Sequence, residues 1–306
     1  MKNFGIIGFG NQAASWALNL ADSNFETHVF TRNKKQINNI ITHELKSESI
    51  DNFNYLALLT PDHTHLEILK SIYANLMDGA VIILAHGYSY TYQELKVEFP
   101  KLNFALLAPK AIGSELRNKF LSGQSLGAVM SSEGCTNETQ QSTNLFIKKL
   151  AKAIGITHGP YPVSFEQETI ADLLSEQSIL CSLLPYGALA SYNQLRKMDI
   201  PKELAYFECW YEVKLIAETM IKVGPEKFFE LISPNALIGS EVAREIFFDQ
   251  QYFERLEKLA SDIKEKKFTK VVDSTDVEEL KKKVLNFWSK QELSSLHNEM
   301  GPKLYN

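Results

Sequence analysis

The first residues of the chain restrict its fold more strongly than any other segment. An apolar run at 4–7 is followed by GFGNQA and then by the helical ASWALNLADS. This order of strand, glycine turn and helix places Gly8, Gly10 and Ala13 at the spacing GxGxxG/A. The first glycine permits a tight turn, the second lets backbone amides approach an anion, and the small third residue lets helix and strand pack closely. The pattern predicts the beginning of a dinucleotide-binding fold.

Short apolar segments alternate with helical ones through the rest of the first half. The expected strands are THVFT, YLALLT, AVIILAHG, FALLAPK and LGAVMSS, with helical stretches such as HLEILKSIYANL between them. Such alternation is typical of a parallel sheet covered by helices on both faces. From about residue 165 the sequence is helical throughout. We therefore expect an α/β Rossmann-type domain with a doubly wound parallel sheet at 1–164 and an all-α domain at 165–306.

The residues after the second expected strand indicate the cofactor. NAD-dependent folds usually carry an acidic residue there, which binds the ribose hydroxyls. Here the segment reads VFTRNKKQ, and its basic residues suit the 2′-phosphate of NADPH instead. A solvated basic loop is the alternative interpretation. The expected cofactor-binding residues are Gly8, Phe9, Gly10, Asn11, Gln12, Arg32, Lys34 and Lys35.

Two pairs of acidic residues lie in apolar helical stretches of the second half. Asp172 and Glu176 are four residues apart in ETIADLLSEQSILC, and so are Glu208 and Glu212 in ELAYFECWYEVKLI. Residues at this spacing lie on one face of a helix. Because an uncompensated buried carboxylate is costly, clustered acids in such helices favour a divalent cation that prefers oxygen, Mg²⁺ or Mn²⁺. The alternative is that each pair lies on a narrow solvated stripe.

Composition excludes several classes of protein. A length of 306 residues with 44% hydrophobic and 23% charged residues is ordinary for a soluble protein with two domains. The net charge of −5 argues against nucleic acid as a partner. Three cysteines without a CxxC spacing suggest neither disulfides nor a zinc site. There is no apolar run of membrane-spanning length and no room for a signal peptide before the first strand, so we expect a cytoplasmic protein.

Taken together, these segments resemble the ketol-acid reductoisomerase family, also called acetohydroxy acid isomeroreductase, in its short form. GFGNQAASWALNL resembles the family's GYGSQGHAHALNL, and LLTPDHTHLEI, ILAHG and FALLAPK resemble segments that follow its later strands. ETIADLLSEQSILC is similar to its ETDLFGEQAVLC, and AYFECWYEVKLI to its AYFECLHELKLI. The resemblance runs from about residue 4 to about residue 240. Its most specific part is AYFEC with a second glutamate four residues after the first.

The resemblance implies roles for particular residues. It implies four ligands of two Mg²⁺ ions, Asp172, Glu176, Glu208 and Glu212. It also implies that Ser233 in LISPNA contacts the substrate carboxylate, and that His86 and Lys110 lie in the active site. Lys110, or a water held by Glu212, is the candidate for proton transfer. Without the resemblance, a structural histidine and a solvated lysine are the alternatives, and His63 and His65 receive no role.

The implied reaction is an alkyl migration in a 2-hydroxy-3-keto acid such as 2-acetolactate, followed by hydride transfer from NADPH, which yields a 2,3-dihydroxy acid for branched-chain amino-acid biosynthesis. The implied partner is a second copy of the chain, in a homodimer with intertwined helical domains and without nucleic acid or membrane. APKAIGSELR and SPNALIG depart from the family's usual segments. The alternatives are a divergent paralogue with another substrate, a metal-independent NADPH reductase of the 3-hydroxy acid dehydrogenase or imine reductase type, and an inactive assembly subunit.

Overall fold

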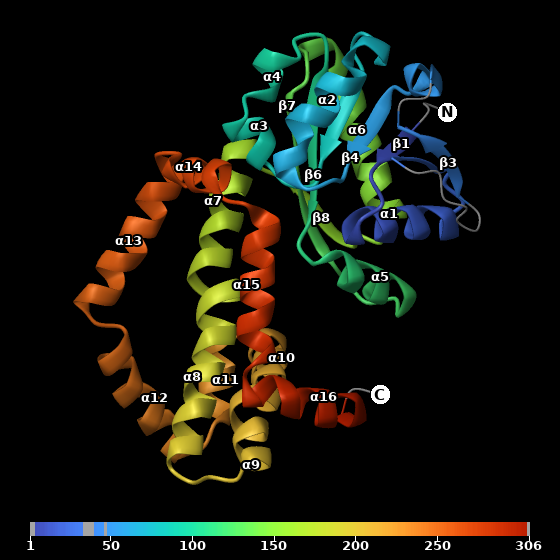
Figure 1. The fold of residues 1–306 in the computed structure, drawn as a ribbon. Helices are drawn as coiled ribbons and strands as arrows, with labels where there is room; N and C mark the ends of the chain where they lie inside the picture. Colours follow the sequence, from blue (N-terminus) through green and yellow to red (C-terminus); the bar gives the residue numbers. More distant parts are fainter. Residues whose placement is uncertain (1–3, 33–39, 46–47, 305–306) are drawn as a thin grey trace. The chain divides into compact units, whose positions relative to one another are not determined.

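The computed structural model describes residues 4–32, 40–45 and 48–304. The chain divides into two compact units, Met1–Ala171 and Asp172–Asn306. The first unit contains an eight-stranded sheet in the order β3-β2-β1-β4-β5-β6-β7-β8 (Figure 1). Its strands are β1 (Phe4–Ile7), β2 (His28–Thr31), β3 (Ile41–Glu44), β4 (Tyr55–Leu58), β5 (Val81–Leu84), β6 (Asn103–Pro109), β7 (Gly127–Gly134) and β8 (His158–Pro162). Its helices are α1 (Asn11–Asp22), α2 (His65–Ile72), α3 (Tyr88–Tyr92), α4 (Leu95–Glu98), α5 (Gly113–Leu121) and α6 (Asn137–Ala153).

The sheet has an apolar layer on each of its faces, as expected for a doubly wound fold. Along β5, Val81 and Ile83 belong to one buried cluster and Ile82 and Leu84 to the other, because successive side chains of a strand point to opposite faces. Helices α1 and α6 contribute to the first cluster, and α2 contributes to the second. The α/β Rossmann-type fold predicted from the alternation of strands and helices is confirmed.

One strand runs against the predicted direction. Strand β7 is antiparallel to β6, whereas every other neighbouring pair is parallel. Helix α5, which joins them, packs against α1 through an ion pair of 2.7 Å between Arg117 and Asp22. The backbone N–H of Lys110 at the end of β6 donates to the carbonyl of Gly127 at the start of β7. The chain therefore enters β7 at the same end of the sheet at which it left β6, so β7 must run antiparallel to β6.

The second unit is helical and has a small core. After α7 (Phe165–Ser175), which begins in the first unit, its segments are α8 (Leu184–Lys197), α9 (Lys202–Tyr206), α10 (Glu212–Val223), α11 (Pro225–Leu231), α12 (Pro234–Phe247), α13 (Gln250–Lys264), α14 (Lys267–Ser274), α15 (Val277–Ser289), α16 (Glu292–Leu304) and the π-helical η4 (Glu176–Leu183) and η5 (Phe207–Tyr211) (Figure 1). Its core cluster consists of Leu189, Tyr192, Ala205, Tyr206, Leu293 and Leu296. Many large apolar side chains are exposed instead, among them Ile216, Ile238, Ile246, Phe247 and Leu285. Nowhere in 4–32, 40–45 or 48–304 is a helix both long and apolar enough to cross a membrane.

Candidate active site

The glycine turn after β1 has the conformation that its sequence predicts. Gly8 has a φ of +105°, in the region that favours glycine, and a Cβ on it would lie 2.8 Å from Thr60 Cγ2. Gly10 is the N-cap of α1 and provides no side-chain cap, so the first backbone N–H groups of the helix have no side-chain acceptor from the cap residue. No atom lies within 4 Å of the place of a Cβ on Gly10. The turn thus offers space and donors to an anion.

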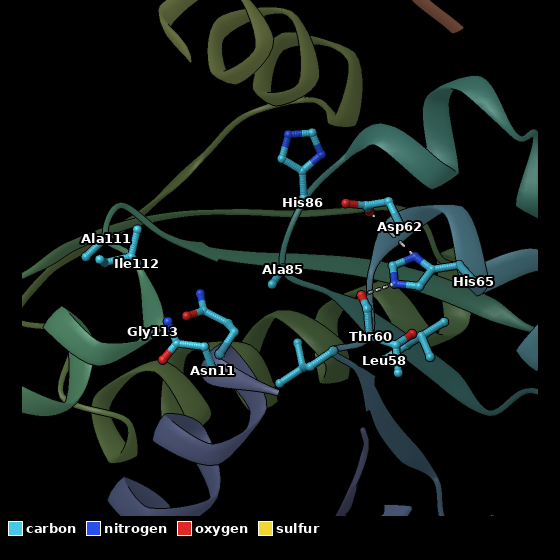
Figure 2. Close-up of a pocket in the computed structure, with 12 residues that line it drawn as sticks. Asn11, Leu58, Thr60, Asp62, His65, Ala85, His86, Ala111, Ile112 and Gly113 are labelled. Carbon is cyan, nitrogen blue, oxygen red and sulfur yellow. Dashed lines mark hydrogen bonds and ion pairs between the residues drawn. The ribbon is translucent and has the colours of Figure 1, made fainter. Parts of the chain in front are cut away.

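A cavity of about 340 Å³ adjoins this turn (Figure 2). Its walls come from segments at or just after the carboxyl ends of β1, β4, β5 and β6, the edge at which doubly wound sheets bind ligands. The lining residues are Asn11, Gln12, Leu58, Leu59, Thr60, Asp62, His65, Ala85, His86, Ala111, Ile112 and Gly113. Gln12 Oε1 is buried and has no hydrogen-bond partner in the described part of the chain, which leaves a polar atom for a ligand.

The other residues expected to bind the cofactor lie around the cavity in different ways. Phe9 packs against the apolar core and does not line the cavity. Arg32 is exposed immediately after β2. Lys34 and Lys35 lie outside the described residues. The AIGS segment, which differs from the family's usual sequence, contains a glycine that the packing requires. A Cβ on Gly113 would lie only 2.5 Å from the carbonyl oxygen of Asn11.

His86 and Lys110 meet at a residue that the sequence analysis does not single out, Glu168 on α7. Lys110 Nζ lies 2.7 Å from Glu168 Oε1, and the backbone N–H of Gly87 donates to Glu168 Oε2 at 2.7 Å. A nitrogen of His86 lies within 4.8 Å of a Glu168 oxygen. A Cβ on Gly87 would lie 2.5 Å from the Phe165 carbonyl oxygen, so this glycine allows α7 to begin close to the loop after β5. The structure therefore assembles a histidine, a lysine and a carboxylate beside the cavity.

The electrostatics of this cluster depend on the Glu168 side chain, which is fully buried, whereas that of Lys110 is 42% exposed. A buried carboxylate needs a cation and hydrogen bonds. Lys110 provides the cation, and the Gly87 amide occupies the second oxygen. His86 accepts a hydrogen bond from the Tyr88 amide at Nδ1, at 2.9 Å, so its neutral ring carries the proton on Nε2. Glu168 has a signal in the sequence, because it precedes Asp172 by the same four residues that separate Asp172 from Glu176.

The four acids predicted to bind metal lie in the second unit, at junctions between α-helix and π-helix. Asp172 lies in the last turn of α7 and Glu176 begins η4, while Glu208 lies in η5 and Glu212 begins α10. Asp172 is half-buried and the three glutamates are exposed. In the described part of this single chain, no three of these four carboxylates have ligand atoms within 4.8 Å of one another.

The pKa values of two neighbouring thiols are affected by these acids. Burial, together with the carboxylates of Glu176 and Asp172, raises the pKa of Cys181, and burial together with Glu208 raises the pKa of Cys209. A cation at either pair would be favoured by the same potential. Ser233, expected to contact the substrate, caps helix α12, where its Oγ accepts a hydrogen bond of 3.2 Å from the backbone N–H of Ala236.

Comparison with known protein families gives two matches that together cover nearly the whole chain. Residues 1–159 match the family model described as acetohydroxy acid isomeroreductase, NADPH-binding domain, and residues 165–306 match that of the ketol-acid reductoisomerase C-terminal domain. The chain is 32% identical over 275 residues to the ketol-acid reductoisomerase (NADP(+)) of Helicobacter acinonychis, with 87% of this chain and 82% of the relative covered. It is 32% identical over 277 residues to that of Helicobacter pylori, with the same coverage. These matches confirm the resemblance seen in the sequence.

Solved structures add support for the fold. The NADH-preferring ketol-acid reductoisomerase from an uncultured archean aligns with a TM-score of 0.85 at 21% identity, over 98% of this chain and 94% of that one. Pyrroline carboxylate reductase from Plasmodium falciparum aligns with a TM-score of 0.57 at 15% identity, over 86% of this chain and 97% of that one. At such identities the likeness concerns the fold alone.

Proposed function

Because this chain belongs to the ketol-acid reductoisomerase family, an NADP-dependent family of oxidoreductases, we propose that it isomerises and reduces 2-acetolactate or a closely related 2-hydroxy-3-keto acid to a 2,3-dihydroxy acid. The proposed cofactors are NADPH and two Mg²⁺ ions. One observation carries the proposal. The ion pair of the buried Glu168 with Lys110 lies beside His86 at a cavity that has the glycine turn of a dinucleotide site as its other wall.

The residues around the cavity fit NADPH. The uncapped N-terminus of α1 suits a pyrophosphate, and the orphaned Gln12 side chain offers a hydrogen bond from within the cavity. Arg32, exposed at the end of the neighbouring strand, suits a 2′-phosphate through charge-assisted hydrogen bonds. These residues would bind and orient the cofactor, while the apolar side chains of Leu58, Leu59 and Ile112 would limit the access of water to it.

The donor set of the four acids fits Mg²⁺, which prefers carboxylate oxygens. Asp172, Glu176, Glu208 and Glu212 would hold the ions, and the carboxylates that add to the effect of burial in raising the pKa of the Cys181 and Cys209 thiols would also favour a cation there. When bound, the two ions would polarise the substrate's hydroxyl and carbonyl oxygens for the alkyl migration, and NADPH would supply the hydride.

A second copy of the chain is the proposed partner of the helical unit. In one chain the two acidic pairs do not gather into a cluster of three carboxylates among the described residues, and the helices that carry them expose Ile179, Leu180, Leu215 and Ile216. Exposed apolar surface on this scale is typical of an interface between subunits. We propose that an intertwined homodimer covers these faces and completes each site with an acidic pair from either subunit.

The remaining side chains have roles in binding and proton transfer. Lys110 is held at a fixed place by Glu168 and can donate a proton to a developing alkoxide, which its positive charge also stabilises. A water held by Glu212 is the alternative proton carrier. His86, oriented by the Tyr88 amide, presents its Nε2–H as a hydrogen-bond donor. Ser233, at the N-terminus of α12, would bind the substrate carboxylate with the help of the helix dipole.

The proposal is tested by following the loss of NADPH absorbance with 2-acetolactate as substrate. Turnover that requires Mg²⁺, stops with EDTA and returns with added Mg²⁺ would support it. The variant Glu208→Gln should lose turnover while it still binds NADPH, since Glu208 lies in the other unit from the cavity. Glu257→Gln, an exposed glutamate of α13, is the matched control. NADPH oxidation that persists without a divalent metal would contradict the proposal and favour a metal-independent reductase.

A further inference from the structure

One buried histidine of the cavity has no role in the function described so far. His65 is the first residue of α2, is 3% exposed and lines the cavity, in contrast to His63 of the same loop, which is exposed. Figure 2 shows its ring between Thr60 and Asp62, with an interaction to each. A histidine buried this deeply must have partners for both ring nitrogens.

Both hydrogen bonds of the ring are defined by their partners. Nε2 lies 2.9 Å from the carbonyl oxygen of Thr60, which can only accept, so Nε2 carries the proton. Nδ1 lies 2.8 Å from the hydroxyl of Ser89, a fully buried side chain, and the neutral ring therefore accepts the Ser89 proton there. The neutral form of His65 thus gives both of its ring nitrogens a hydrogen-bond partner.

These two bonds connect two walls of the cavity. Thr60 belongs to the segment after β4, which lies against the glycine turn: a Cβ on Gly8 would meet Thr60 Cγ2, and the Leu59 amide donates to the Ile7 carbonyl. Ser89 lies in α3, three residues after His86 in the loop that follows β5. His65 is therefore a bridge between the wall that abuts the glycine turn and the wall that carries His86.

The direction of the bridge depends on the neutral ring. The groups that face the ring are the Asp62 carboxylate, with Oδ1 3.6 Å from Nδ1, the Thr60 carbonyl, His63 and His86. Burial, aided by the two other histidines and opposed by Asp62 and Thr60, lowers the pKa of His65. A proton on Nδ1 would remove the acceptor of the Ser89 hydroxyl, which would turn to Asp62 Oδ1 at 3.2 Å. The Ser89 hydroxyl would then accept a hydrogen bond from Nδ1–H and donate to Asp62, so the hydrogen bond between the two walls would be reversed in direction.

The cavity extends over β4, β5 and β6, on the opposite side of β1 from β2 and Arg32. A dinucleotide in a doubly wound sheet lies across the glycine turn with one half on each side. If Arg32 receives the 2′-phosphate of the adenosine half, the nicotinamide half occupies this cavity. Resting on the function proposed above, we propose that His65 is a positioning residue for the nicotinamide half of NADPH, which acts by holding the Thr60 and Ser89 walls together in its neutral form.

The test measures the dissociation constant of NADPH by fluorescence titration, with the full-length protein and four variants. His65→Leu loses both hydrogen bonds and should bind NADPH about tenfold more weakly at about pH 8. Ser89→Ala loses one and should bind it about threefold more weakly, and it serves as the test if His65→Leu does not fold. His65→Gln keeps a donor and an acceptor without a titrating ring and should remain within about twofold of the original protein. His63→Gln is the matched control from the exposed side of the same loop.

A pH series separates positioning from mere packing. As the pH falls from about 8 through the usual histidine pKa of about 6.5 and on to the lowest pH at which the protein stays folded, affinity for NADPH should fall more steeply in the original protein than in His65→Gln. The 2′-phosphate of NADPH titrates in this range in every variant, so the difference between the two proteins is the readout. Equal affinities of His65→Leu and the original protein, or the same pH slope in His65→Gln, would overturn this proposal alone. Absence of NADPH binding by the original protein would overturn the proposed function together with it.

Discussion

The ion pair between the half-exposed Lys110 and the buried Glu168 allows a quantitative test of how the site is held together. At 2.7 Å, two unit charges attract by roughly 6 kcal/mol in an effective dielectric of about 20. The Lys110 side chain is 42% exposed, so solvent screening reduces this value considerably. Loss of one partner from a fully buried pair costs about 3–5 kcal/mol, and from an exposed pair about 0–1 kcal/mol. We therefore expect Lys110→Met to lower the free energy of unfolding of the first unit by about 2–3 kcal/mol.

The companion variants separate charge from packing. Glu168→Gln keeps an oxygen for the Gly87 amide and leaves Lys110 free to reach water, so it should cost only about 1 kcal/mol. In the double variant no buried charge remains, and its total loss should also be about 1 kcal/mol, which gives a coupling energy of about 2–3 kcal/mol. Lys101→Met is the matched control, since it breaks the pair with Asp78 at 3.2 Å, whose side chains are 62% and 75% exposed.

The assay is urea unfolding reported by one tryptophan. Trp16 is fully buried in the first unit, whereas Trp210 and Trp288 lie in the second. In a background with both of the latter replaced by Phe, fluorescence follows the first unit alone, which avoids a mixed transition of two units. Additive losses in the double variant, with a coupling below about 0.5 kcal/mol, would refute the reasoning and assign Glu168 to packing alone.

Three further outcomes are expected. Because burial lowers the pKa of His65, the unfolded chain binds this proton more readily, so stability should be full above about pH 6.5 and fall as the pH decreases towards the folded pKa. Urea midpoints across this range should show a smaller fall in His65→Gln, and identical falls would contradict the assignment. Arg32→Ala should weaken NADPH binding about tenfold and leave NADH binding nearly unchanged in fluorescence titrations, whereas equal weakening of both would exclude recognition of the 2′-phosphate. Ile216→Asp places a charge on a side chain of α10 that is 48% exposed in the single chain and lies on the proposed interface, and light scattering should detect a shift from dimer to monomer; an unchanged mass would place the interface elsewhere.

The central strands and the glycine turn could be predicted because their signals are local. Strands β4, β5 and β6 are buried on both faces and read as continuous apolar runs, and Gly8 is needed for one positive φ. The edge strands β3 and β8 were not predicted. Their sequences, ITHE and HGPYP, are largely exposed, so no apolar run or alternation marks them. The predicted direction of β7 was wrong. The direction of this strand depends on where α5 packs, and a pattern of alternating strands and helices does not contain that information.

The residues of the candidate site also divide into those with a local signal in the sequence and those without one. His86 and Lys110 follow apolar strands and were singled out by the family resemblance, and the acidic pairs were visible from their spacing. Glu168 was missed because its place in the site depends on a partly buried contact with Lys110, a residue 58 positions away. His65 was missed because its importance comes from its burial and from Ser89, not from a motif. Side chains whose role is to orient other groups are recognised only when their partners are in place.

The π-helical turns in η4 and η5 place a constraint on the length of the chain as well as on its composition. A π-helical turn contains one residue more than an α-helical turn. Deletion of a single residue from η4 would let the turn relax to the more favourable α-helix with the flanking helical segments nearly in register, whereas the same deletion from α8 would rotate every later side chain of that helix by about 100° relative to those before it. The inserted residue in η4 is therefore accommodated locally, and the helical segments on either side of it keep the relative directions of their side chains. A scan of substitutions leaves this register intact, and only changes in length would reveal it.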